Sequence, residues 1–292
     1  MYENILVPTD GSRGAEGAIA RAFDLARTGN GTVHVLYVVD TGSEPSGLAT
    51  TEREELRQHS EKRGRQATAR IQERATELGL DTVRVVREGV PHRGILDYVA
   101  DNDIDLVVMG THGLAGTERS RLGSTTERVI TLADVPVMAV RLAEDTDVPE
   151  SGYGMYDHVV LPTDGSEAAE RAAAQALEIA ERYGATVHVI YVVDTTTYGF
   201  EDAPRSIVGL LKEGGQKAVD EIATDARDRN LPVTTDILRG VPHEAVLEYA
   251  EGVDADVIAM GTRGRTGDMD RFLGSTTARI VRRSDVPVLA IS

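Results

Sequence analysis

Residues 109–129 read MGTHGLAGTERSRLGSTTERV, and residues 260–280 read MGTRGRTGDMDRFLGSTTARI. Each stretch follows a run of aliphatic residues and comes before a segment that reads as a helix. In both stretches two residues separate the first two glycines, nine more lead to a glycine, and a serine follows it. A spaced pattern that occurs twice predicts a chain made of two copies of one structural unit.

The rest of the chain repeats as well. Four further pairs of segments match: NILVPTDGS (4–12) with HVVLPTDGS (158–166), GTVHVLYVVD (31–40) with ATVHVIYVVD (185–194), REGVPHRGILDYV (87–99) with LRGVPHEAVLEYA (238–250), and DVPVMAV (134–140) with DVPVLAI (285–291). The offset is 154 in the first two pairs and 151 afterwards, so three residues are lost after Asp40 and Asp194. We predict a first domain at 1–142, an acidic linker at 143–154 and a second domain at 155–292.

The composition limits the possible partners. The 292 residues include no cysteine, which excludes disulfides and thiolate metal sites, and the formal net charge is −17. Such a charge repels nucleic acids and anionic membranes, so we expect neither as a partner. The lack of a long apolar run or a leader pattern predicts a soluble, cytoplasmic protein. Only three of the 31 basic residues are lysines, a balance similar to that of halophilic proteins.

Short aliphatic runs alternate with helical patterns in each half. In the first half the runs lie at 4–9, 32–39, 82–86, 105–110 and 135–140. Their valine and isoleucine content is typical of strands buried on both faces. Strands separated by helices form parallel sheets through right-handed crossovers. The sequence thus predicts two tandem Rossmann-like α/β domains, each a five-stranded parallel sheet of order 3-2-1-4-5 with helices on both faces.

Both recurring signatures fall on one edge of the predicted sheet. PTDG follows the first strand of each half, and the glycine-spaced loop follows the fourth. The carboxyl ends of these two strands flank the point where strand order reverses, which is where such sheets bind ligands. Glycines permit positive φ and a close approach of backbone N–H groups to a ligand. The loop glycines, which favour a phosphate ligand, are Gly110, Gly113 and Gly123, with Gly261, Gly264 and Gly274.

A helix is expected to begin directly after each loop. Ser124-Thr125-Thr126-Glu127 has the form of a capping box, whereas Ala278 replaces the glutamate in the second copy. A helix N-terminus offers N–H donors and partial positive charge to an anion, and the hydroxyls of Ser124 and Thr125 add donors. Arginines in the loops add charge: Arg119, Arg121, Arg263, Arg265 and Arg271. The alternatives are a tight turn with no ligand and arginines that only contact solvent.

Two other nucleotide-binding motifs are missing from the sequence. The pattern G-x-x-x-x-G-K-[ST] does not occur, and neither glycine-spaced loop contains lysine. The pattern G-x-G-x-x-G does not follow the first strand. The sequence therefore argues against a P-loop nucleotide hydrolase and against an NAD-binding protein.

The spacing G-x2-G-x9-G-[ST], together with PTDGS, YVVD and DVPV, resembles the ATP-binding branch of the universal stress protein family in a tandem form. The resemblance covers both halves nearly end to end. It implies an adenine nucleotide alpha hydrolase-like fold that binds ATP, or another adenine nucleotide, with Mg²⁺ at the edge of the sheet. It implies no catalytic residue and leaves the metal ligands unknown.

The resemblance also assigns roles by position. Asp10 and Asp164 would lie by the ribose or the metal, backbone groups of Val38 and Val192 would meet adenine, and the glycine loops would hold phosphates. The implied nucleotide-binding residues are Pro8, Thr9, Asp10, Val38, Met109, Gly110, Gly113, Gly123, Ser124 and Thr125, with Pro162, Thr163, Asp164, Val192, Met260, Gly261, Gly264, Gly274, Ser275 and Thr276.

Asp10, Asp164 and the histidines also have an interpretation that involves no ligand. Asp-Gly after a strand commonly forms a turn in which the carboxylate bonds its own backbone. His112 is expected to be an exposed loop residue. His34 and His188 alternate with valines, which favours packing over catalysis, and helix capping or exposure to solvent is expected of His92 and His243.

The leading hypothesis is a tandem universal stress protein with two ATP sites, acting in stress response or signalling as a nucleotide-dependent switch with slow or no hydrolysis and with unidentified protein partners. The alternatives are an enzyme on the same fold, such as a slow ATPase or adenine nucleotide hydrolase, and a nucleotide-free interaction protein. Single-domain relatives dimerise through their last strands. The resemblance thus implies an intramolecular pseudo-dimer through VPVMAV (135–140) and VPVLAI (286–291), and leaves a further homodimer open.

Overall fold

The structure is a computed structural model that describes residues 2–43, 47, 49–113, 122–141, 156–194, 205–264 and 272–292. The chain divides into two compact units, Met1–Gly152 and Tyr153–Ser292, which are called the first and the second unit below. Within the described residues, no helix is long and apolar enough to cross a membrane.

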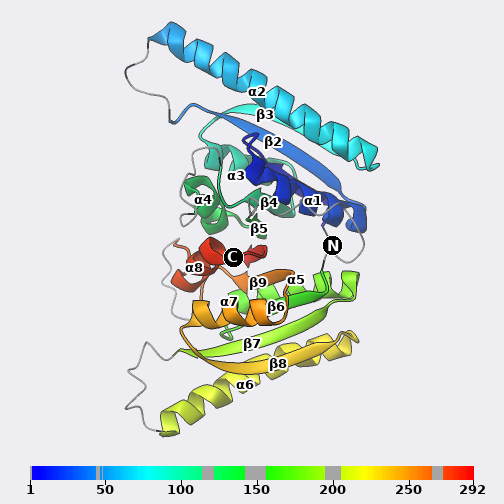
Figure 1. Cartoon of the computed structure of the whole chain (residues 1–292), viewed down its shortest axis with the longest axis vertical. Coiled ribbons are helices and arrows are strands. Elements are labelled where there is room, and N and C mark those ends of the chain that lie inside the picture. The colour runs from blue at the N-terminus through cyan, green and yellow to red at the C-terminus, as the bar shows by residue number, and fades with distance from the viewer. Residues whose placement is uncertain are drawn as a thin grey trace. The chain divides into compact units, whose positions relative to one another are not determined.

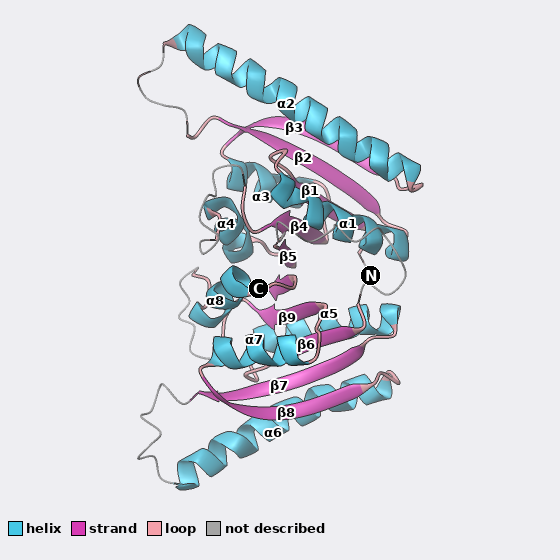
Figure 2. Cartoon of the chain, in the orientation of Figure 1, coloured by secondary structure: helices cyan, strands magenta, loops and turns pink. Residues whose placement is uncertain are grey.

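The first unit alternates strands and helices (Figures 1 and 2). Its elements are β1 (Asn4–Pro8), the short 3-10 helix η1 (Arg13–Ala15), α1 (Glu16–Gly29), β2 (Thr32–Asp40), α2 (Thr50–Glu77), β3 (Thr82–Gly89), α3 (Pro91–Asp101), β4 (Leu106–Gly110), α4 (Ser124–Leu132) and β5 (Val137–Val140). β1 pairs in parallel with β2 and β4, β2 pairs with β3, and β4 pairs with β5. The strand order is therefore β3-β2-β1-β4-β5.

The second unit repeats this plan. Its elements are β6 (His158–Pro162), α5 (Glu167–Tyr183), β7 (Thr186–Asp194), α6 (Arg205–Asp228), β8 (Val233–Gly240), α7 (Pro242–Gly252), β9 (Val257–Gly261), α8 (Ser275–Arg283) and β10 (Val288–Ile291). β6 pairs in parallel with β7 and β9, β7 with β8, and β9 with β10. The predicted α/β fold with two tandem Rossmann-like copies is confirmed.

The central strands form the core of each unit. Ile5, Leu6 and Val7 of β1 are completely buried, as are Val159 and Val160 of β6. Such runs of aliphatic residues suit strands that helices cover on both faces. The prediction that every strand is buried on both faces is wrong for β3 and β8. All of their residues are exposed or half-buried. Each of these strands ends its sheet and so has only one neighbouring strand.

β2 presents alternate side chains to helices on opposite faces. A Cβ built at Gly64 of α2 would lie 2.4 Å from the Tyr37 ring, and one built at Gly94 of α3 would lie 3.2 Å from Val38. Tyr37 therefore faces α2 and its neighbour Val38 faces α3, as the period of two in a strand requires. The carboxyl end of β2 thus carries side chains to both sides of the sheet edge.

Candidate functional site

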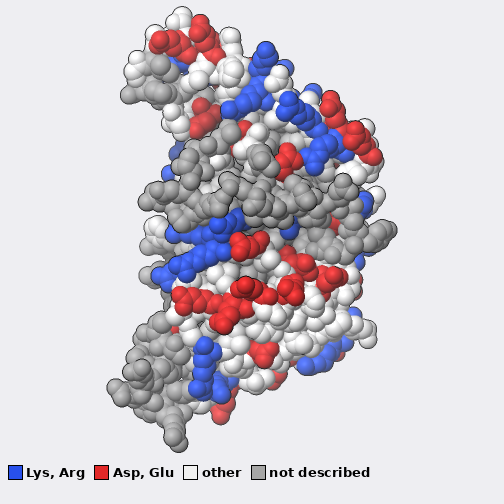
Figure 3. Space-filling model, in the orientation of Figure 1, with Lys and Arg blue, Asp and Glu red and all other residues white. Residues whose placement is uncertain are grey.

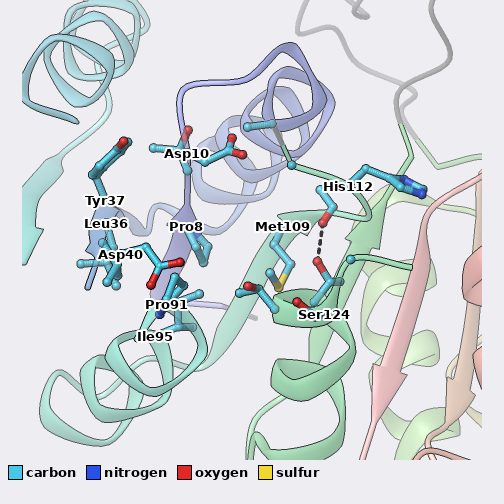
Figure 4. A pocket seen from close by; sticks show the side chains of 18 of the residues that line it. Pro8, Asp10, Leu36, Tyr37, Asp40, Pro91, Ile95, Met109, His112 and Ser124 are labelled. Atoms are coloured by element: carbon cyan, nitrogen blue, oxygen red, sulfur yellow. Dashed lines mark hydrogen bonds between the residues drawn. The ribbon is translucent and has the colours of Figure 1, made fainter. Parts of the chain in front are cut away.

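The carboxyl edge of the first unit contains a cavity of about 750 Å³ (Figure 4). The ends of β1, β2 and β4 form its floor, and α2, α3 and the start of α4 form its walls. All ten residues predicted for the first site line this one cavity: Pro8, Thr9, Asp10, Val38, Met109, Gly110, Gly113, Gly123, Ser124 and Thr125. They come from segments that are far apart in the sequence, and the parallel sheet brings them together.

The sequence analysis missed several lining residues. Leu36, Tyr37 and Asp40 lie at the end of β2, Ser60 and Arg63 lie on α2, and Pro91 and Ile95 lie at the start of α3. Leu36, Tyr37 and Asp40 lie in the repeated segment GTVHVLYVVD (31–40), so the duplication was a signal for them. Ser60 and Arg63 gave no signal, because α6 has different residues at the equivalent positions.

The PTDG segments form the same turn in both units. Asp10 Oδ1 accepts a hydrogen bond from the Ser12 N–H at 2.9 Å, and the Gly11 N–H donates to the Thr9 hydroxyl at 3.1 Å. Gly11 has φ of +76°, which glycine adopts without strain. In the second unit the Asp164 and Thr163 bonds are both 3.1 Å, and φ of Gly165 is +73°. The turn interpretation of Asp10 is confirmed, and its ligand role stays a prediction.

The loop glycines leave room for other groups of the protein. Within the described residues, none of the six has positive φ. A Cβ at Gly113 would lie 2.5 Å from Asp10 Oδ2, and one at Gly264 would lie 2.6 Å from Asp164 Oδ2. A Cβ at Gly110 would lie 2.6 Å from a backbone oxygen of η1. The expectation of positive φ is therefore wrong, because these glycines make room for the protein's own carboxylate and backbone.

The predicted capping box at Ser124 is also wrong. Gly123 occupies the N-cap position of α4, so Ser124 is already in the first turn and no side chain caps the helix. The start of α4 is fixed instead by the Gly123 N–H, which donates to the Thr111 carbonyl at 2.9 Å, and by the Thr126 hydroxyl, which donates to the Gly110 carbonyl at 2.8 Å. The first turn of α4 therefore faces the cavity without a capping side chain.

The second unit has the same arrangement at its sheet edge. Gly274 occupies the N-cap position of α8, also without a capping side chain. Its N–H donates to the Thr262 carbonyl at 2.9 Å, and the Thr277 hydroxyl donates to the Gly261 carbonyl at 2.9 Å. The predicted residues Pro162, Thr163, Asp164, Val192, Met260, Gly261, Gly264, Gly274, Ser275 and Thr276 lie at the ends of β6, β7 and β9, in the adjoining turn and loop, and at the start of α8.

Two of the four histidines discussed next occupy the expected positions, and two do not. His34 is buried and its Nδ1 lies 2.9 Å from the Tyr98 hydroxyl, which confirms a packing role, and His188 is likewise buried. His112 is half-buried and lines the cavity, so the expectation of an exposed residue is wrong. His243 is only 5% exposed, which contradicts the expected capping or solvent position.

His243 owes its burial to the packing of α7 against α8. Its Nε2 lies 3.3 Å from Arg283 Nη1. Burial lowers the pKa of His243, and the charges of Arg279 and Arg283 lower it further. Figure 3 shows basic side chains gathered over α8 and acidic ones over α7. His243 is therefore a neutral packing residue between these helices.

Among the described residues that line the first cavity, the arginine is Arg63 of α2. Arg63 donates to the Tyr37 hydroxyl from Nε at 3.2 Å and from Nη2 at 3.0 Å, and that hydroxyl lies 3.3 Å from Ser60 Oγ. Arg119 and Arg121 of the first loop, and Arg265 and Arg271 of the second, lie outside the described residues. Arg263 is described and is half-buried.

The fold and the first cavity define a class of protein: a tandem doubly wound α/β protein with a cavity at the carboxyl edge of its first sheet. The model of the universal stress protein family matches residues 1–141 and 155–292. The chain therefore belongs to the universal stress protein family, as a tandem form.

Relatives support this assignment over one unit and over the whole chain. A universal stress protein of Methanocaldococcus jannaschii is 38% identical over 144 residues, covering 48% of this chain and 85% of that protein. A universal stress protein of Synechocystis is 25% identical over 310 residues, covering 98% of this chain and 99% of the relative. The crystal structure of a universal stress protein from Archaeoglobus fulgidus, 22% identical, matches with a TM-score of 0.70 over 99% of this chain and 96% of that one.

Proposed function

We propose that the chain binds an adenine nucleotide, ATP in the first instance, at the carboxyl edge of each unit. One observation carries the proposal: ten residues chosen from sequence for nucleotide binding line a single cavity of about 750 Å³ in the first unit. That volume lies within the range of pockets for small molecules and cofactors. The equivalent residues of the second unit follow the same turn, loop and helix start, which supports a second site.

The walls of the first cavity divide into an apolar and a polar side. Leu36, Val38 and Ile95 offer an apolar surface that suits the flat face of adenine. Ser124 and Thr125 stand in the uncapped first turn of α4, where N–H groups and the helix dipole favour phosphate oxygens. Asp10 lies between these regions and suits the ribose hydroxyls or a metal ion.

One carboxylate of the cavity fits a magnesium ion that arrives with the nucleotide. Mg²⁺ is commonly held by one or two carboxylates together with substrate phosphates. Asp10 lines the cavity, whereas Asp40 lies beside Pro91 and Ile95 in Figure 4 and accepts hydrogen bonds from Gly42 and Ser43. Within the described residues no group of three acidic or histidine side chains could hold a metal alone. Asp10 would thus supply an oxygen ligand only as part of a nucleotide complex.

The proposed role is a nucleotide-dependent switch in stress response or signalling with slow or no hydrolysis. Partner proteins would read the nucleotide state, and their identity, the pairing of the last strands and a cytoplasmic location stay predictions. Figure 4 shows the His112 ring directed away from Asp10, Met109 and Ser124, so this lining residue does not favour the alternative of a slow ATPase.

Removing the charge of the two PTDG aspartates tests the binding proposal. Asp10→Asn and Asp164→Asn keep the turn, because an amide oxygen still accepts the bond from Ser12 or Ser166. Native mass spectrometry of the wild type should show two adenine nucleotides per chain. Each single variant should weaken one site by roughly tenfold in calorimetry, on the scale of one hydrogen bond to a charged group.

The matched control is Asp103→Asn, which makes the same charge change at an exposed residue with φ of +47°, a conformation that asparagine tolerates. It should bind like the wild type. Absence of saturable binding at millimolar ATP in the wild type would refute the proposal.

A further inference from the structure

Among the described residues, the two units differ in which arginines they place at the sheet-edge site. The α2 and α6 helices align through Gly64 and Gly215, where an added Cβ would lie 2.4 Å from Tyr37 and 2.5 Å from Tyr191 respectively. With this alignment Arg63 of α2 corresponds to Gly214 of α6. In the described part of the glycine-spaced loop, His112 of the first unit corresponds to Arg263 of the second.

Arg63 is exposed at the cavity wall and is oriented by hydroxyl groups. Two of its nitrogens donate to the Tyr37 hydroxyl, and Ser60 Oγ lies 3.3 Å from the same oxygen. Among the described residues no carboxylate lies within 4.0 Å of its guanidinium. A guanidinium has five N–H donors, so charge and donors are left for a ligand in the cavity.

Arg63 and the start of α4 lie on opposite sides of the cavity. Figure 4 shows Tyr37, the anchor of Arg63, on one side and Ser124 on the other, with Asp10, Pro8 and Met109 between them. The first cavity thus has one anion-attracting group at each end. In the second unit Gly214 stands at the position of Arg63, so this end of the site lacks that charge.

Arg63 is not needed to hold the tyrosine. Tyr191 packs against Gly215 as closely as Tyr37 packs against Gly64, although Gly214 replaces the arginine and Leu211 replaces Ser60. A structural role in positioning the ring therefore does not explain why the first unit has the charge. A role toward a ligand in the cavity does.

We propose that Arg63 makes the first site selective for an adenine nucleotide with a phosphate on the 3′ oxygen of the ribose as well as on the 5′ oxygen. Adenosine 3′,5′-bisphosphate is a simple example. The 5′ phosphate would take the start of α4, and Arg63 would bind the phosphate on the ribose. This inference rests on the proposed function. The second site, with Gly214 in place of Arg63, would lack this preference.

Calorimetry of the full chain with AMP and with adenosine 3′,5′-bisphosphate tests the inference. The wild type should bind the bisphosphate roughly tenfold more tightly than AMP at one of its two sites, the scale of one charge-assisted hydrogen bond. Arg63→Gln should abolish that advantage and leave AMP affinity within about twofold. Gly214→Arg, at a position with open space around it, should create the advantage at the second site.

Lys62→Gln is the control for net charge, since Lys62 is an exposed cation of α2 beside Arg63 and does not line the cavity. It should change neither affinity. The inference is overturned if the wild type does not distinguish the two ligands, or if Arg63→Gln weakens both equally. If AMP and ATP themselves fail to bind, the proposed function has failed. If they bind and the bisphosphate has no advantage, only the role of Arg63 has failed.

Discussion

The first and second units have the same residues where glycines pack closely against other groups. They have different residues at positions that reach the cavity. Gly113 and Gly264 both leave room for an aspartate, and Gly64 and Gly215 both leave room for a tyrosine ring. Arg63 and His112, by contrast, have no equivalents in the second unit. Duplicated units can therefore share one sheet edge and still present different chemistry to a ligand.

The largest expected effect is at the two buried glycines of the long helices. Gly64→Ala and Gly215→Ala would each place a methyl group 2.4–2.5 Å from a tyrosine ring. Overpacking of this kind costs about 2 kcal/mol, more than the gain of up to about 1 kcal/mol in helix propensity. Both units should lose stability to a similar extent, as measured by hydrogen exchange in each unit.

The control is Gly214→Ala on the same helix, because nothing lies within 4 Å of its Cβ position. This variant should be stabilised by about 0.5–1 kcal/mol through helix propensity alone. A Gly64→Ala protein as stable as the wild type would mean that Tyr37 moves aside freely, and the alignment of α2 with α6 would then lose its basis.

The sequence predicted the strands whose aliphatic runs occur in both halves of the chain. Aliphatic runs at 4–9 and 105–110 became β1 and β4, and PTDG and the glycine loops follow them at one edge. Strand pairing then brought all ten predicted residues of the first site into one cavity. The strand predictions succeeded because buried parallel strands and their carboxyl ends depend on local patterns that a duplication displays twice, whereas the nucleotide-binding role of the lining residues stays a prediction.

What the sequence did not predict depends on contacts between distant segments. Asp10 and Gly113 are far apart in the chain, so no local pattern shows that the glycine makes room for a carboxylate. Arg63 lies within a strongly polar helix whose many charges hide the one that reaches the cavity. The capping box failed because a glycine at the N-cap position shifted the serine into the first turn.

A smaller difference is expected at the start of the first helix of each unit. Ser166 is the N-cap of α5, and its Oγ accepts from the Ala169 N–H at 3.3 Å. The equivalent Ser12 is followed by η1, and its hydroxyl has no partner among the described residues. Ser166→Ala should therefore destabilise the second unit by about 1 kcal/mol, and Ser12→Ala should change the first by less than about 0.5 kcal/mol. Equal losses in thermal unfolding would show that Ser12 also acts as a cap.

The smallest expected difference concerns pH and the buried histidines. His188 Nε2 lies 3.0 Å from His158 Nδ1, and its Nδ1 faces the Thr234 hydroxyl at 3.0 Å and the Tyr249 hydroxyl at 3.4 Å. Burial lowers the pKa of His188, His158 lowers it further, and Asp236 opposes them. In the first unit burial lowers the pKa of His34 and Asp105 opposes it. There Asn4 takes the place of His158, so no second imidazole is present.

Because both pKa values are lowered in the folded state, protonation favours unfolding. Stability should be full above the ordinary histidine pKa of about 6.5 and should fall as the pH drops below it. The second unit should lose more, since two facing imidazoles repel once charged. His158→Asn copies the first unit and should reduce the pH slope of the second unit to that of the first, measured by hydrogen exchange between pH 7.5 and 5. An unchanged slope would mean that His188 alone causes the loss, and the pair of histidines would not distinguish the two units.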